Sequence, residues 1–166
     1  MEKKKNEIIE LFLWTDGSCN NNSKHSSFGV GGWAFSVLSK DGETIFEDVG
    51  FEKQTSSSRM EQTALLEGLK WLKKEYSDKY IHIEIYSDSA YVVNCFKQRW
   101  FDRWFEIEFL GIKNSDLWLE ILSFRGDRKF KMNFNHVKGH SGIENNERVD
   151  FLAGEARKYY LELLQS

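Results

Sequence analysis

Proline is absent from this chain of 166 residues, and cysteine is scarce. Without proline, the turns must depend on Gly, Asn, Asp and Ser. The two cysteines, Cys19 and Cys95, form neither a CxxC pair nor a zinc-like group. This pattern argues against a disulfide framework or a structural zinc site and favours reduced thiols.

Long hydrophobic runs and a strong charge balance are also missing. No stretch is apolar for long enough to span a membrane, and no hydrophobic signal segment follows the basic start of the chain. We therefore expect a cytosolic, cytoplasmic protein that does not bind a membrane. The formal net charge is only −3, so any attraction to nucleic acid must come from local basic surfaces.

Apolar residues make up 40% of the chain and aromatic residues 15%, which is enough for one sizeable core. We expect a single domain over residues 1–166, with a core at about 8–163 and a flexible tail at 1–6. A monomer is expected.

The order of apolar patterns predicts an α/β fold. The expected strands lie at about 7–14, 29–38, 44–52, 81–86 and 130–136, and the expected helices at about 57–76 and 145–163, with two or three short helices between 89 and 124. The Asp41-Gly42 turn makes the first three strands an antiparallel meander. Strand-helix alternation in the second half implies parallel pairing there.

Four carboxylates stand where packing does not need them: Asp16, Glu61, Asp88 and Asp150. Asp16 and Asp88 each follow an apolar run, which predicts the carboxyl ends of two strands, where parallel sheets hold ligands. Glu61 shares the core-facing stripe of its helix, and Asp150 borders the apolar face of the closing helix. Such hard oxygen ligands, taken together, are typical of a Mg²⁺ site.

Each acid also has an ordinary explanation. Asp88 would serve as a helix N-cap and Asp16 as a turn former before Gly17. Glu61 and Asp150 would be first-turn acids that favour the helix dipole.

Five segments link these acids to a known family. They are Thr15-Asp16-Gly17-Ser18-Cys19, Ser58-Arg59-Met60-Glu61, Tyr86-Ser87-Asp88-Ser89-Ala90-Tyr91-Val92, Asn114-Ser115-Asp116-Leu117-Trp118, and Val137-Lys138-Gly139-His140-Ser141-Gly142 followed by Asn146-Glu147-Arg148-Val149-Asp150. In this order the chain resembles ribonuclease H of type 1, the endonuclease that cuts RNA paired with DNA, over about residues 11–160. The resemblance implies a ribonuclease H-like fold: a five-stranded mixed sheet, an antiparallel meander plus two parallel strands, flanked by helices.

The resemblance also implies a two-metal mechanism with two Mg²⁺ ions bound together with substrate, for which Mn²⁺ would be a substitute. Asp16 would bridge the ions, Asp88 and Glu61 would bind on one side, and Asp150 would complete the other. The products would carry 5′-phosphate and 3′-hydroxyl ends. His140, in a glycine-rich loop, would assist the attacking water or product departure, although a solvated or helix-capping histidine is the ordinary alternative.

The RNA/DNA hybrid implied as partner needs contacts on both strands. By family match, Asn22, Ser57 and Ser58 would line the minor groove, with backbone groups around Gly17 and Cys19. The DNA strand would meet a phosphate pocket of Ser56 and Asn114 in which Gln54 replaces the usual Arg, and a channel lined by Trp100 and Trp104. Core packing is the alternative role of the two tryptophans.

The clearest departure from the family is a protrusion at 105–112 that is short and nearly free of basic residues. We expect weak, salt-tolerant hybrid binding from it. Its apolar residues, with Phe101, would pack on their own domain or dock a protein partner. The segment from Arg125 to His140 instead carries five basic residues against one acid, which an ordinary solvated strand edge would explain.

Two other classes of function stay open. One is a catalytically weak or silent module of the same fold that binds nucleic acid or protein. The other is a DNA nuclease of the same fold, because a fold does not fix a function.

Overall fold

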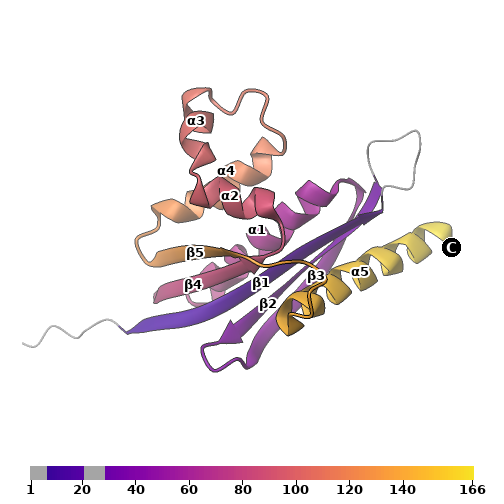
Figure 1. The fold of residues 1–166 in the computed structure, drawn as a ribbon, viewed down its shortest axis with the longest axis horizontal. Coiled ribbons are helices and arrows are strands. Elements are labelled where there is room, and N and C mark those ends of the chain that lie inside the picture. Colours follow the sequence, from indigo (N-terminus) through magenta and orange to yellow (C-terminus); the bar gives the residue numbers. More distant parts are fainter. Residues whose placement is uncertain (1–6, 21–28) are drawn as a thin grey trace, which may run out of the picture.

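A five-stranded mixed sheet forms the centre of the computed structural model, which describes residues 7–20 and 29–166. The strands are β1 (Ile8–Asn20), β2 (Gly29–Ser39), β3 (Thr44–Thr55), β4 (Tyr80–Ser87) and β5 (Phe130–His136), in the order β3-β2-β1-β4-β5 (Figure 1). The first three pair in antiparallel fashion, and β4 and β5 run parallel to β1. The predicted fold class is confirmed.

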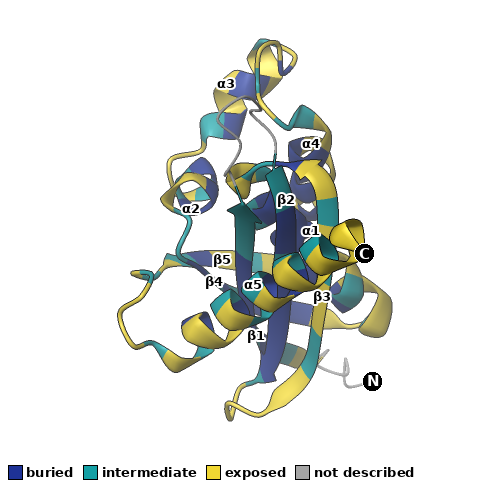
Figure 2. Cartoon of the chain, turned by 90° about the vertical axis from the view of Figure 1, so that its right-hand side faces the viewer, coloured by how far each residue is buried: buried dark blue, intermediate teal, exposed yellow. Residues whose placement is uncertain are grey.

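Helices cover both faces of the sheet (Figure 2). They are α1 (Ser57–Glu75), α2 (Ala90–Lys97), α3 (Trp100–Glu106), α4 (Ser115–Ser123) and α5 (Glu144–Gln165), with a short 3₁₀ turn, η1 (Phe124–Gly126), after α4. Alternation along β4 buries Ile81, Ile83 and Ile85 in the large core beneath α1. A smaller core, in which Val149 of α5 packs on Trp14, lies on the other face. None of the helices in the described residues has the length and hydropathy to cross a bilayer.

The first strand is longer than its apolar run predicts. Its parallel pairing with β4 ends at Trp14↔Tyr86, but its antiparallel pairing with β2 continues to Asn20↔Val30. The expected strand end at about residue 14 is therefore wrong. Antiparallel pairing with β2 extends β1 beyond the last residue that pairs with β4. Asp16 lies inside a strand, at the point where one neighbour has ended.

The hairpin between β2 and β3 has the predicted turn. Gly42 has a φ of +86°, and its N–H donates to the Ser39 carbonyl at 2.9 Å. The long helix α1 begins after Ser56, whose side chain accepts from the Arg59 N–H at 3.2 Å.

The apolar residues of the protrusion and the neighbouring Phe101 differ in burial. Phe101 and Phe109 are buried, and Ile112 packs against the large core, whereas Phe105 and Leu110 are exposed. The burial of Phe101 and Phe109 agrees with the expectation that the cluster packs on its own domain. Docking of a partner stays a prediction that would rest on two exposed side chains.

Gly17 allows the start of α1 to approach β1. A Cβ at Gly17 would overlap backbone atoms of Met60 and Glu61, so the two elements would have to move apart. We predict that Gly17→Ala destabilises the protein by about 1–3 kcal/mol, a typical overpacking cost. Gly154→Ala is the control, because its Cβ meets nothing within 4 Å in α5, and it should stabilise the helix by up to about 1 kcal/mol. Urea denaturation measures both; equal effects would contradict the close-approach argument.

Candidate active site

Three carboxylates from three elements converge. Asp16 of β1, Glu61 of α1 and Asp88 after β4 each offer one oxygen, and these oxygens lie within 4.8 Å of one another. The sheet register explains the first pair, because Asp16 and Asp88 each lie two residues beyond the last parallel pair, Trp14↔Tyr86. The close approach at Gly17 brings Glu61 to them.

The helix-cap, turn and first-turn roles that would be the ordinary explanations of these acids do not match their positions in the structure. The N-cap of α2 is Ser89, whose hydroxyl accepts from the Val92 N–H at 3.3 Å, so Asp88 does not cap the helix. Asp16 lies within a strand rather than a turn. Glu61 and Asp150 both lie beyond the first turns of α1 and α5.

The three acids are crowded, and Asp16 is buried while Glu61 and Asp88 are partly buried. Asp16 is only 2% exposed, and Glu61 Oε2 is buried without a hydrogen-bond partner. Burial raises the pKa of Asp16, and the charges of Glu61 and Asp88 raise it further. Burial likewise raises the pKa of Glu61. No Lys or Arg in the described parts of the chain forms an ion pair with this group.

Buried carboxylates without a counter-charge are costly unless they are protonated or bind a cation. The orphan oxygen of Glu61 and the all-carboxylate donor set fit a hard divalent cation such as Mg²⁺.

Asp150 and His140 lie next to this group. A hydrogen bond to Asp150 contributes to the raised pKa of Asp16, although Asp150 is not within the three-acid group and its side chain is 44% exposed. His140 Nδ1 is 4.0 Å from Asp150 Oδ2, and the His140 side chain is 87% exposed. His140 also adopts a left-handed φ of +55°. The fourth acid and the histidine therefore form the open side of the site.

Comparison with known proteins agrees with this geometry. Residues 9–158 match the RNase H family. The chain belongs to the RNase H family. A protein named Ribonuclease H from Thermoanaerobacter sp. (strain X514) is 38% identical over 158 residues, which cover 92% of this chain and 93% of that protein.

Solved structures share the fold of this RNase H. LC9-RNase H1, described as a type 1 RNase H, has a TM-score of 0.79 and 21% identity, and the match covers 93% of this chain and 75% of that chain. LC11-RNase H1, solved in complex with RNA/DNA hybrid, has a TM-score of 0.68 and 20% identity, and the match covers 91% and 99%. The resemblance predicted from the five segments is confirmed.

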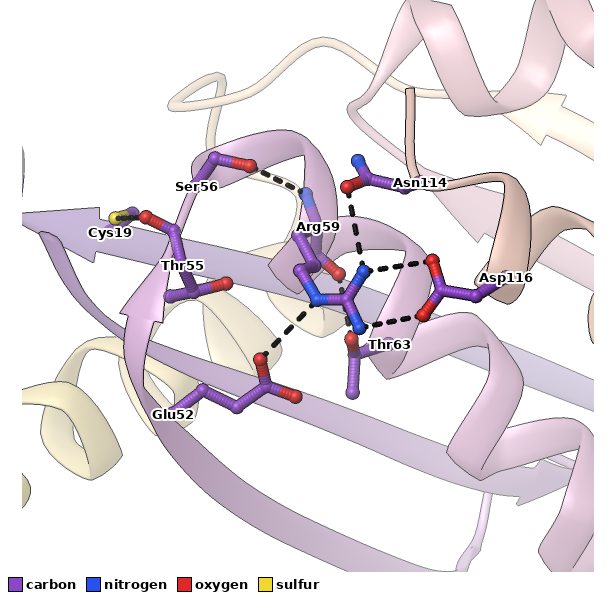
Figure 3. Close-up of polar contacts among 8 residues, drawn as sticks. All are labelled: Cys19, Glu52, Thr55, Ser56, Arg59, Thr63, Asn114 and Asp116. Atoms are coloured by element: carbon purple, nitrogen blue, oxygen red, sulfur yellow. Dashed lines mark hydrogen bonds and ion pairs between the residues drawn. The ribbon is translucent and has the colours of Figure 1, made fainter. Parts of the chain in front are cut away.

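An arginine organises the neighbouring surface of this RNase H (Figure 3). The Arg59 guanidinium donates to both Asp116 oxygens at 3.1 and 2.9 Å, and its Nε lies 3.6 Å from Glu52. Its Nη1 also donates to Asn114 Oδ1 at 3.5 Å, while its backbone N–H donates to Ser56. Ser56 and Asn114 are thereby tied to one residue, and Asn114 keeps its amide N–H groups for another acceptor.

The other predicted substrate residues are distributed around the site. Ser57 and Ser58 are exposed at the start of α1, and Gln54 is exposed near the end of β3. Gly17 and Cys19 lie on β1, where the Cys19 thiol donates to the Thr55 carbonyl at 3.5 Å. Asn22 lies outside the described residues, as does the predicted tail at 1–6.

The two tryptophans differ. Trp104 is 9% exposed and packs on Trp118, with ring centroids 5.4 Å apart. Trp100 is less buried, and its indole N–H donates to Gln98 at 3.0 Å. Core packing thus describes Trp104 well, and Trp100 keeps more surface for a ligand.

Two residues at the site were not assigned roles from the sequence. Buried Asn146 donates to Asp88 Oδ2 at 3.5 Å, and Arg59 ties Asn114 to α1. Asn146 stands three and seven residues before the buried Val149 and Ala153 of α5, so a polar residue on the helix's apolar stripe was the available signal.

The crowding of the acids leads to a prediction of how the stability of the protein depends on pH when a chelator removes metal ions. Because the pKa values of Asp16 and Glu61 are raised, the folded state holds protons that the unfolded chain releases above pH ~4, and stability falls as the pH rises from there through neutrality. Asp16→Asn should therefore raise the melting temperature at pH 8 by several degrees, since one pKa unit is worth about 1.4 kcal/mol and ~1 kcal/mol moves Tm by about 2–4 °C.

The exposed hairpin variant Asp41→Asn is the control and should change Tm little. Thermal melts in EDTA between pH 5 and 9 measure the effect, using a range that begins about one unit above the carboxyl reference values. An Asp16→Asn protein less stable than its parent at pH 8 would refute the account of repulsion.

Proposed function

We propose that this chain hydrolyses the RNA strand of RNA/DNA hybrids endonucleolytically, with two Mg²⁺ ions and products carrying 5′-phosphate and 3′-hydroxyl ends. The observation that carries the proposal is the convergence of Asp16, Glu61 and Asp88 in a partly buried cluster, in which one Glu61 oxygen has no hydrogen-bond partner. Membership of the RNase H family, and the hybrid bound by LC11-RNase H1, favour this substrate.

Asp16, Glu61 and Asp88 would hold the metal pair, and Asp150 would complete the set from the open side. When bound, such a pair activates a water and stabilises the leaving oxygen of a phosphodiester. Asn146 would orient Asp88 through its amide. Asp150 is partly exposed, so the full site would form only with substrate, because a solvated carboxylate binds a cation weakly until phosphate oxygens join it.

His140 would move protons at the open side of the site. Its ring is exposed and lies 4.0 Å from Asp150, so it can reach a water or a departing product without displacing buried groups. A histidine exchanges protons near neutral pH.

The hybrid would lie across the start of α1. The exposed Ser57 and Ser58 offer hydroxyl groups to a minor groove, and the free amide of Asn114 with the Ser56 hydroxyl offers donors to a DNA phosphate. Gln54 brings no charge to this pocket, and the charge of Arg59 is shared with Asp116 and Glu52. We therefore expect a weaker hold on the DNA strand than a free arginine would give.

A silent binding module and a DNA nuclease are the competing functions. A binding module would not need a buried cluster of unpaired acids, because that cluster lowers stability without metal. Cleavage of a labelled hybrid, compared with double-stranded DNA, double-stranded RNA and single strands, separates all three functions.

Our first catalytic prediction concerns Asp88. Asp88→Asn should abolish nearly all Mg²⁺-dependent hybrid cleavage while the circular dichroism spectrum stays unchanged, because the amide occupies the same volume but is a poor cation ligand. The exposed Asp78→Asn, beyond the far end of α1, is the control and should retain full activity. Residual Asp88→Asn activity comparable to the parent, or parent activity in excess EDTA, would contradict metal-dependent catalysis.

The second catalytic prediction concerns His140. His140→Ala should reduce turnover by about 10² to 10⁴-fold, the range of general acid-base assistance, without abolishing it. Affinity for hybrid in chelator should not change, because the ring is 87% exposed and supports no packing. Turnover measured from pH 6 to 9 tests this, a range that brackets the ordinary imidazole pKa of about 6.5; an identical profile for parent and variant would remove His140 from the mechanism.

The charges near the protrusion lead to a prediction of how the affinity for hybrid depends on salt concentration. Arg99 pairs with Asp102 at 2.9 Å and Arg103 pairs with Glu106 at 3.1 Å, so both arginines of this region are already neutralised. We predict weak hybrid binding with a shallow salt slope, which Glu106→Lys/Glu108→Lys should strengthen and steepen by roughly one to two phosphate contacts.

Glu43→Lys/Glu75→Lys, at the β2–β3 hairpin and the end of α1, gives the same charge change away from the protrusion. Anisotropy of a labelled hybrid in EDTA at several salt concentrations compares the three proteins. Equal gains in the two double variants would show a non-specific charge effect and contradict the prediction.

A further inference from the structure

A concave surface outside the carboxylate cluster is lined by residues of α2, α3, η1 and the edge strand β5. Figure 1 shows where these elements lie. We call it the basic hollow. Its volume is about 620 Å³. Its lining residues are Phe96, Lys97, Arg99, Phe101, Arg125, Arg128, Phe130, Lys131, Met132, Asn133 and Phe134.

Five cations and no carboxylate line the basic hollow. Arg99 is paired with Asp102, but Lys97, Arg125, Arg128 and Lys131 have no ion pair within residues 7–20 and 29–166. The chain as a whole has a net charge of −3, so the unpaired positive charge of the basic hollow is a local feature and not a property of the whole surface. Three of these cations belong to the basic stretch seen in the sequence, but a plain solvated edge would not place them around a hollow.

The floor of the basic hollow is aromatic and already packed. Phe96 stacks on Phe134 with ring centroids 3.9 Å apart, and Phe101, Phe130 and Phe134 are all buried. The Arg125 guanidinium lies 4.0 Å from the Phe101 ring centroid, and that of Arg99 lies 5.1 Å from it. Both distances are within the range of a cation–π contact, and a guanidinium is a planar, charged group on which a base can stack.

We propose that the basic hollow binds single-stranded nucleic acid. Lys97, Arg128 and Lys131 would contact phosphates, and an unpaired base would stack on the platform of Arg125. An apolar peptide is less suited, because the phenyl rings leave little apolar surface to bury. A duplex is also less suited, because its bases are not free to enter a hollow.

The place of the basic hollow connects it with the carboxylate cluster. Phe130 is the first residue of β5, and Phe134 lies further along the same strand. The strand ends at His136, whose Nε2 lies 3.2 Å from the Asp88 carbonyl oxygen. At about 3.3 Å per residue, the hollow begins within roughly 20 Å of the acids along this strand. A hybrid with a single-stranded extension would therefore contact both surfaces, whereas a blunt hybrid would contact one.

The test is a binding titration of the full chain in EDTA, so that it does not depend on the proposed hydrolysis. A fluorescein-labelled oligothymidylate is the probe, read by anisotropy at low salt. Arg128→Glu/Lys131→Glu should weaken binding at least about tenfold, as expected for two lost phosphate contacts. Both side chains are exposed and form no side-chain hydrogen bond or ion pair within the described residues, so the fold should be kept and blunt-hybrid cleavage should remain at the parent's level.

Lys40→Glu/Lys74→Glu, at the hairpin and near the end of α1, is the matched charge control and should weaken binding less than about threefold. Arg125→Lys tests the platform, because it keeps the charge but loses the plane. The parent should prefer oligothymidylate to an abasic strand of the same length, and Arg125→Lys should reduce that preference.

Three results would overturn the proposal: no oligothymidylate binding by the parent, equal losses in the two double variants, or binding of an acidic peptide at the hollow without binding of the oligonucleotide. Failure of hybrid cleavage would leave this titration unaffected, so the two proposals fail separately.

Discussion

The central constraint on this structure is the mutual repulsion of three carboxylates that lie close together and are partly or wholly buried. Asp16, Glu61 and Asp88 lie within reach of one ion, and no basic side chain of the described residues pairs with them. Such an arrangement lowers the stability of the metal-free fold and persists only if the surrounding framework holds it. The large core on one side of the sheet and the smaller core beneath α5 supply that framework.

The position of the acids is set by two neighbouring residues of β1, Asp16 and Gly17. The strand loses its parallel neighbour after Trp14 but keeps its antiparallel neighbour, so the backbone of Asp16 is paired on one side only. Gly17 then lets α1 approach closely enough for Glu61 to join it. Asp150 and His140 come from the start of α5 and the loop before it, where exposure permits exchange with substrate and solvent. The proposed metal site would therefore combine carboxylates held by the sheet with solvated groups that a substrate can reach.

Much of this was predictable from the sequence, because strand and helix periodicity, the Asp41-Gly42 turn and the acids that follow two apolar runs are local signals. The placement of the four acids indicated a shared cation, and the role of each acid came from the family resemblance. The true end of β1 was not predictable, because it is set by pairing with β2 and not by the apolar run of β1. The Arg59 network joins residues 55 and 57 positions apart, and no local pattern signals such a contact. The basic hollow likewise requires tertiary structure, since Lys97 and Arg99 are far in sequence from Lys131.

The central claim is that the buried acids form a cation site completed by the hybrid. Counting bound Mn²⁺ by electron paramagnetic resonance, with and without a hybrid whose RNA strand is 2′-O-methylated and resists cleavage, tests this most directly. The account predicts about two ions per chain with hybrid, as in a two-metal site, and fewer without it. Stoichiometry that is the same in both conditions, or no bound Mn²⁺ in either, would contradict it.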